Sequence, residues 1–110
     1  MKVPLARLAH TRSGDKGNKV NVGVMAWRER DYPILVRELT PGRIKTFFGE
    51  SVGGPVLRYE LPNLAALNFV LHDALDGGGT LSLRTDAQGK TFGARLLELE
   101  IEVEAHELED

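Results

Sequence analysis

The sequence predicts an α+β domain, a two-layer sandwich in which helices cover one face of a largely antiparallel sheet. Two observations lead to this class. The first is that stretches in which every second residue is apolar, which are typical of half-buried strands, are interspersed with stretches of helical spacing. The second is the order of these stretches along the chain. In chain order, the expected elements are two strands, two helices, a strand, a helix, a strand, a short helical turn and a final strand. A chain of 110 residues is long enough for one core, so we expect residues 1–110 to form a single domain.

The first two strands are expected at residues 3–12 and 20–27. Pro4 stands near the start of the first strand, where a missing N–H is tolerated. The second strand is the clearer one, because alternate apolar residues share one face: Val20, Val22, Val24 and Ala26. Residues 13–18 between them are rich in Gly, Asp and Asn, so we expect a hairpin with an elaborated loop.

Two helices and a strand are expected next. Asp31 is expected to cap a helix that ends at residue 39. Thr40 followed by proline starts a second helix, and Gly49 ends it. After a glycine-rich turn, residues 56–61 are expected to form a strand.

The most regular helical pattern follows Asn63, which is the expected N-cap. Its stripe obeys the i, i+3, i+4, i+7 rule through Leu64, Leu67, Asn68, Leu71 and Leu75, and the glycines at 77–79 end the helix. Asn68 is the polar member of this stripe, so a buried amide there needs hydrogen-bond partners. Either it bonds to a loop backbone or it contacts a ligand.

The C-terminal part predicts a strand over 80–86, a helical turn over 90–96 and a final strand over 97–104. In the final strand, apolar residues alternate with four glutamates: Glu98, Glu100, Glu102 and Glu104. Four like charges on one face repel one another unless nearby cations pair with them. Solvation is the default for such a row, and the basic first half of the chain is the candidate source of cations.

Charge and composition exclude several classes of protein. The net charge of −2 argues against an unspecialised nucleic-acid binder, although residues 1–50 carry +5 and residues 51–110 carry −7. No apolar run is long enough to span a bilayer, and the N-terminus lacks the apolar core of a signal peptide. With no cysteine there is no disulfide framework and no thiolate nucleophile. We therefore expect a cytoplasmic protein that does not bind membranes.

The candidate site is the expected hairpin loop. Its glycines would let backbone N–H groups turn toward a common point, as in an anion-binding concavity, and its cations and neutral polar groups suit a phosphate, a carboxylate or a phosphopantetheine thioester. The candidate residues are Arg12, Ser13, Gly14, Asp15, Lys16, Gly17 and Asn18. The alternative is a plain hairpin turn whose Gly, Asp and Asn satisfy turn geometry.

Asp15 has two functional interpretations. It could act as a general base, or it could pair with Lys16 or Arg12 and orient them. The cationic surroundings favour the ionised carboxylate and hence the orienting role. No second acid lies close in sequence, so no metal site is expected, and no cofactor motif is present.

The chain resembles the carboxy-terminal domain of the acyclic terpene utilisation protein AtuA family. The resemblance rests on the string Arg-Ser-Gly-Asp-Lys-Gly-Asn at 12–18, on 59–64 and 66–71, and on the segments around residues 82–90. It implies a ferredoxin-like fold, and a module that usually follows a much larger domain. It also implies an association with the catabolism of branched acyclic terpenoids as coenzyme A thioesters. The motif positions carried over for binding are Arg12, Ser13, Asp15, Lys16, Asn18, Asn63, Asn68 and Arg84.

Three functional hypotheses follow. The first is an accessory subunit of an AtuA-like system, reassembled with a larger AtuA N-terminal-type partner. The second is a free-standing binding protein or small enzyme of hydratase or lyase type for an acyl-CoA or another anionic metabolite. The third is a homo-oligomeric structural module in which the glutamate row and the basic half of the chain meet across subunits.

Overall fold

The structure is a computed structural model that describes residues 1–74 and 90–109. Its helices and strands follow in the order β1 (Lys2–Pro4), β2 (Ala9–Lys16), β3 (Lys19–Ala26), α1 (Tyr32–Glu38), α2 (Pro41–Phe48), β4 (Val56–Leu61), β5 (Ala66–Leu71), α3 (Lys90–Leu96) and β6 (Glu100–Glu102). The expected glycine turn at 77–79, the expected strand at 80–86, Leu75 and Arg84 lie outside the described residues.

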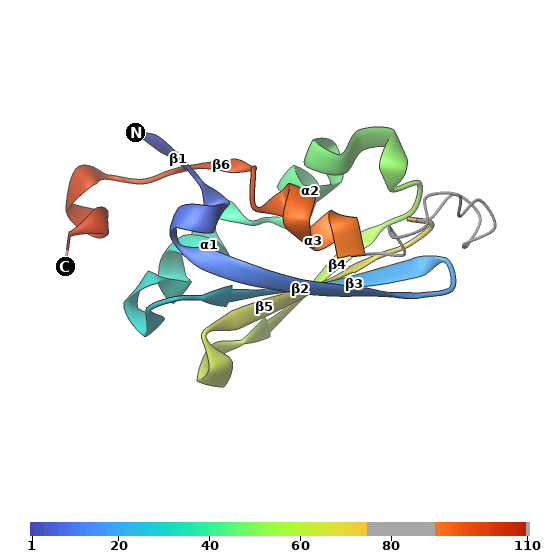
Figure 1. The fold of residues 1–110 in the computed structure, drawn as a ribbon, viewed down its shortest axis with the longest axis horizontal. Helices are drawn as coiled ribbons and strands as arrows, with labels where there is room; N and C mark the ends of the chain where they lie inside the picture. The colour runs from blue at the N-terminus through green and yellow to red at the C-terminus, as the bar shows by residue number, and fades with distance from the viewer. Residues whose placement is uncertain (75–89, 110) are drawn as a thin grey trace.

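The main sheet is antiparallel throughout, with the strand order β2-β3-β5-β4. The helices lie on one side of it, together with a second, two-stranded antiparallel sheet of β1 and β6 (Figure 1). No helix of the described residues covers the other side (Figure 1). The α+β class with helices on one face, predicted from the sequence, is therefore confirmed.

The core lies between the main sheet and the helices. Alternate residues of the two central strands point into it and are fully buried: Val20, Val22 and Val24 of β3, and Leu67, Phe69 and Leu71 of β5. From the helical side, Leu35, Ile44 and Leu96 complete it. Burial of this apolar surface provides the main driving force for folding.

Several local predictions are confirmed. The Thr40 hydroxyl caps α2 by accepting a hydrogen bond from the backbone N–H of Arg43 at 3.1 Å, and Gly49 ends the helix with φ of 58°. Asp31 does precede α1, but it does not cap it. Its carboxylate is buried and accepts a hydrogen bond from Arg28 Nε at 3.0 Å instead.

The helix expected after Asn63 is wrong, because residues 66–71 form the central strand β5. Leu67 and Leu71 are four residues apart, so they satisfy the period of a strand as well as that of a helix. Phe69 lies between them and shares their buried face, whereas Leu64 is 68% exposed. Asn63 lies in a 3₁₀ turn, Pro62–Leu64, which Ala65 ends with φ of 50°. Pairing with β3 and β4 on either side decides the conformation of this segment.

The hairpin loop expected at 13–18 is also shorter than predicted. Strand β2 continues to Lys16 and pairs with β3 along its whole length, so only Gly17 and Asn18 form the turn. Gly17 has φ of 71° and Asn18 does not have a positive φ, which is the pattern of a two-residue type II′ turn. A 3₁₀ turn at Leu5–Arg7 divides the first expected strand into β1 and β2.

The acidic C-terminal segment is held by cations of the first half of the chain, the candidate source of cations, whereas solvation was the default expected for the glutamate row. Glu107 accepts a hydrogen bond from Arg37 Nη1 at 3.0 Å, and Glu102 pairs with the N-terminal amine at 2.6 Å. The final strand is limited to Glu100–Glu102, although Leu99, Ile101 and Val103 are buried as expected.

Glu38 connects α1 to this segment. Its carboxylate accepts hydrogen bonds from Arg43 Nη1 at 2.9 Å, from Arg37 Nε at 3.1 Å and from the backbone N–H of Glu102 at 3.0 Å. Burial acts to raise the pKa of Glu38, but the Glu102 N–H and the two guanidinium groups outweigh it and hold the pKa below the usual 4.5.

Glu38→Gln is expected to lower the free energy of unfolding near neutral pH by about 1 kcal/mol. A lowered folded-state pKa stabilises the protein above pH 4.5, and that contribution is lost as the pH falls below it. The variant should therefore approach the stability of the parent chain in acid. Urea unfolding at neutral and acidic pH measures this, with Glu50→Gln, an exposed acid, as the control. A difference between variant and parent that persists unchanged in acid would contradict the role given to Glu38.

Candidate functional site: the open face of the sheet

The uncovered face of the main sheet carries the side chains that alternate with the buried ones. Strand register arranges them in three rows, each running across the sheet from β2 through β3 and β5 to β4. The rows are His10, Met25, Ala66 and Leu61; Arg12, Gly23, Asn68 and Tyr59; and Gly14, Asn21, Val70 and Leu57. We call these twelve positions the open face.

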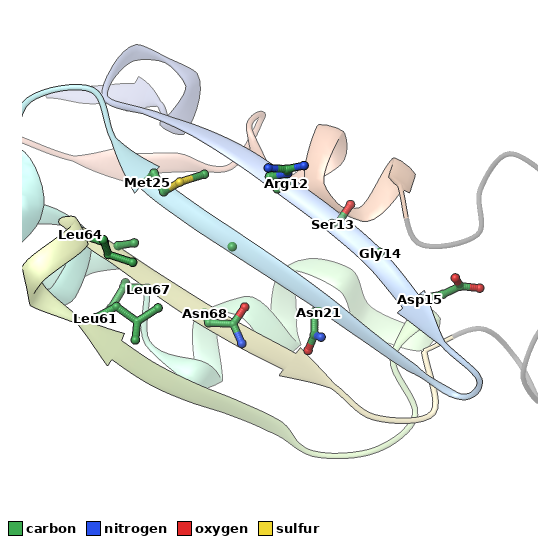
Figure 2. Close-up of a pocket in the computed structure, with 12 residues that line it drawn as sticks. Arg12, Ser13, Gly14, Asp15, Asn21, Met25, Leu61, Leu64, Leu67 and Asn68 are labelled. Atoms are coloured by element: carbon green, nitrogen blue, oxygen red, sulfur yellow. The ribbon is translucent and has the colours of Figure 1, made fainter.

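The open face is hollowed near its centre because three of its positions have a small side chain or no side chain. Gly14 and Gly23 leave bare backbone there, and Ala66 adds only a methyl group. The hollow has a volume of about 400 Å³ and is open to solvent, and its walls include Arg12, Asn21, Asn68, Met25, Leu61 and Leu64. Figure 2 shows Asn68 and Asn21 on neighbouring strands, with the leucines gathered at one end.

One part of the hollow is polar. The Asn68 side-chain oxygen lies over Gly23, where an added methyl group would be 4.0 Å from it. Among the described residues, no side-chain hydrogen bond or ion pair is formed by Arg12, Asn21 or Asn68. A guanidinium and two amides are therefore available for a carboxylate, a phosphate or a peptide group.

The other part is apolar and continues beyond the hollow. Leu64 lies outside the twelve positions but lines the hollow, and it is 68% exposed. Tyr59 and Leu61 of the open face are 50% and 40% exposed. Trp27 follows β3 on the same face, is 63% exposed, and stacks on His10 with 4.3 Å between the ring centroids. The open face is thus amphipathic, and large apolar side chains are concentrated on it.

The structure separates the predicted site residues. Arg12, Gly14 and Asn68 belong to the open face. Ser13 and Asp15 border the hollow, but strand alternation directs their side chains to the covered face. There the Ser13 hydroxyl accepts a hydrogen bond from the backbone N–H of Gly93 at 3.2 Å and anchors α3. Because Arg12 and Asp15 point to opposite faces of β2, Asp15 does not pair with Arg12 in this structure.

The remaining candidates lie away from the hollow. Lys16 is the last residue of β2, and Gly17 forms the turn. Asn18 connects the turn to the end of β5, because its carbonyl accepts a hydrogen bond from Ala74 N at 2.9 Å and its side-chain amide donates to Asp73 at 3.5 Å. Asn63 is exposed in its 3₁₀ turn and does not line the hollow.

Sequence reasoning missed several residues of the hollow. The signal for Asn21, Gly23 and Met25 was present, because they alternate with the buried valines of β3 and so belong to the opposite face. Leu61 and Leu64 could not be found in this way, because Leu64 was assigned to the stripe of a helix that does not form.

Two kinds of feature do not occur among the described residues: a cluster of metal-ligating side chains and a membrane-spanning helix. No group of three or more His, Asp or Glu side chains there is arranged to hold a metal ion. No helix among them is long and apolar enough to cross a membrane.

Comparison with known proteins identifies a family. The sequence model of one protein family, described as AtuA ferredoxin-like domain, matches residues 3–102, nearly the whole chain. No curated protein and no solved structure matches the chain. The fold that this family name describes agrees with the α+β architecture found here.

Proposed function

Because the chain belongs to the AtuA ferredoxin-like domain family, we propose that it is an accessory module that docks through its open face onto a larger protein of AtuA type. Such an assembly would act in the catabolism of acyl-CoA or terpenoid-type compounds. The observation that carries the proposal is the concentration of exposed apolar side chains on the one sheet face that no helix of the described residues covers.

The composition of this face supports docking to a protein. Aromatic residues, Met and Arg are enriched at the centres of protein interfaces, whereas other charged residues are depleted there. The open face has Tyr59, Met25 and Arg12, with Trp27 beside it, and Arg12 is the one charged residue among its twelve positions. Trp, Tyr and Arg are also the residues that contribute most often to binding hot spots.

The test is affinity capture from the native host with the tagged chain, followed by mass spectrometry. We expect a larger AtuA-type protein to be recovered, and Leu64→Asp to reduce its recovery by about tenfold or more, because it places a charge in a desolvated contact. The matched control is Thr46→Asp, an exposed position on α2. Equal recovery with Leu64→Asp and Thr46→Asp would exclude the open face as the docking surface.

A second candidate function is the binding of an amphipathic anion such as an acyl-CoA. It is favoured by the position of Arg12, Asn21 and Asn68 beside Met25 and Leu61, which suits an anionic or amide group attached to an apolar chain. Ligand-induced thermal stabilisation by an acyl-CoA should disappear in Arg12→Ala, and also in Gly23→Val, which fills the hollow. Arg30→Ala, another exposed arginine, is the control. An equal response to acyl-CoA, free CoA and free acids would contradict specific binding of the acyl thioester.

A further inference from the structure

Among the strands of the described residues, β4 lies at an edge of the main sheet, and its outward hydrogen-bonding groups can be identified. The backbone N–H of His72 donates to the carbonyl of Pro55 at 3.0 Å, in register with the β4–β5 ladder. Hydrogen-bonded pairs recur at every second residue of an antiparallel ladder. Leu57, Tyr59 and Leu61 therefore direct their backbone groups toward β5, whereas Val56, Arg58 and Glu60 direct theirs outward. Among the described residues, no hydrogen bond satisfies these outward groups.

We propose that β4 pairs with β4 of a second copy of this chain, antiparallel about a two-fold axis at Tyr59, so that the two main sheets join into one continuous sheet. In this register, Arg58 lies opposite Glu60 of the second copy and forms a hydrogen-bonded pair with it. Glu60 lies opposite the other Arg58 in the same way. The two pairs exchange backbone hydrogen bonds through the groups that are outward in each chain.

The side chains of β4 favour this register over its neighbours. Opposite charges across an antiparallel pair are stabilising, and like charges are destabilising. A two-fold axis at Arg58 would place two arginines opposite each other, and an axis at Glu60 would place two glutamates opposite each other. An axis at Leu57 would give neither charge a charged partner in the second copy. The register centred on Tyr59 is the one that matches both charges of the strand.

Arg58 is held in place for such a contact. Its Nη1 donates hydrogen bonds to the carbonyls of Val36 at 2.8 Å and Leu39 at 3.0 Å, at the end of α1. Its Nη2 donates a hydrogen bond to Glu60 of the same chain at 3.1 Å, and the Arg58 side chain is 18% exposed. An inward-pointing charge on an edge strand discourages pairing with unrelated strands. A second β4 brings the matching carboxylate, so the same charge becomes a basis for specificity.

The open face also matches itself in this register. Leu57 would lie opposite Leu61 of the second copy, and the two Tyr59 rings would meet at the axis. These side chains are 42%, 40% and 50% exposed, so pairing would remove apolar surface from water. The two open faces would then form one continuous surface. The inference therefore goes beyond the docking of a larger partner and does not depend on it.

Cross-linking of single-cysteine variants of the full chain tests the register. The chain contains no cysteine, so each introduced thiol is unique. In Tyr59→Cys, the two residues form a non-hydrogen-bonded pair with Cα atoms about 4.5 Å apart, within the range of about 4.4–6.8 Å that a disulfide spans. We expect rapid formation of an inter-chain disulfide under oxidising conditions.

The matched control is Leu57→Cys, on the same strand and face. Its counterpart in the second copy is four residues out of register, about 13 Å away, and cannot form a disulfide within the pair. Selective cross-linking of Tyr59→Cys supports the proposal, whereas equal cross-linking of the two variants overturns it.

Sedimentation over micromolar to millimolar concentrations supplies an independent measurement. The parent chain should form a dimer, and Glu60→Lys should raise the dimer dissociation constant by about tenfold or more, because both cross-strand pairs become repulsive. Glu60 is 52% exposed, so this variant should fold normally. Glu50→Lys changes the net charge equally and should leave the dimer unaffected. A parent chain that is monomeric throughout, or equal dissociation constants for the two variants, would overturn the proposal.

Discussion

Phe69→Ala is expected to lower the free energy of unfolding by about 3–5 kcal/mol. Phe69 lies at the centre of β5, its side chain is fully buried, and both neighbouring strands pair with its backbone. Truncation removes the transfer free energy of the ring and leaves a cavity that the surrounding strands cannot fill. Denaturant unfolding followed by circular dichroism measures the loss.

The matched control for this prediction is Leu64→Ala. If residues 64–75 formed the helix that their spacing first indicated, Leu64 would be a core residue and its truncation would be costly. In the structure it is 68% exposed, so the change should remain within about 0.5 kcal/mol. A larger loss for Leu64→Ala than for Phe69→Ala would contradict the strand.

Gly93→Val is expected to be the second large effect, a loss of about 1–3 kcal/mol in the free energy of unfolding. Gly93 is the point where α3 rests on β2. A Cβ atom there would lie 2.9 Å from Ser13 Oγ, closer than such contacts occur, and 3.0 Å from Thr11 Oγ1, which is also a tight contact. The same two hydroxyls bond to the backbone of Gly93, since Thr11 donates to its carbonyl at 3.0 Å and Ser13 accepts from its N–H. The larger side chain would displace α3 and break both bonds.

Thermal and denaturant unfolding of Gly93→Val would be compared with those of Ala94→Val. Ala94 is the next residue of the helix and is exposed, so that substitution should cost only the helix propensity of valine, roughly 0.5 kcal/mol. Similar losses for the two variants would show that the close contacts with Ser13 and Thr11 do not restrict the size of the side chain at position 93.

The hydrogen bond from Gly93 N–H gives Ser13 a structural role, the anchoring of α3 to β2. Ser13 belongs to the string that resembles the AtuA family, and its neighbours Arg12 and Gly14 belong to the open face. A strand presents consecutive residues to opposite sides, so this one string serves two surfaces. One surface carries α3, and the other is the face proposed for docking.

The two proposed contacts share the open-face side chains of β4 but differ in what else they use. Docking of a larger protein uses the rest of the open face, whereas self-association uses the outward backbone groups of Val56, Arg58 and Glu60. Leu64→Asp therefore tests the first contact and Glu60→Lys the second. Either contact can fail while the other remains.

Where the conformation depends on nearby residues, the sequence alone was sufficient. The Thr40 cap, the end of α2 at Gly49 and the buried valines of β3 follow from local capping and periodicity. The helical turn expected at 90–96 is confirmed as α3. The α+β class follows from the order of such elements, and it is confirmed.

Only the tertiary structure decided the conformation of β5 and the extent of β2. Leu67 and Leu71 fit a helix and a strand equally well, and the choice came from β3 and β4, whose residues are distant in sequence. In the same way, pairing with β3 extended β2 to Lys16 and so placed Arg12 and Asp15 on opposite faces. The physical reason is that a helix satisfies its hydrogen bonds within one segment, whereas a strand depends on partners that the local sequence does not specify.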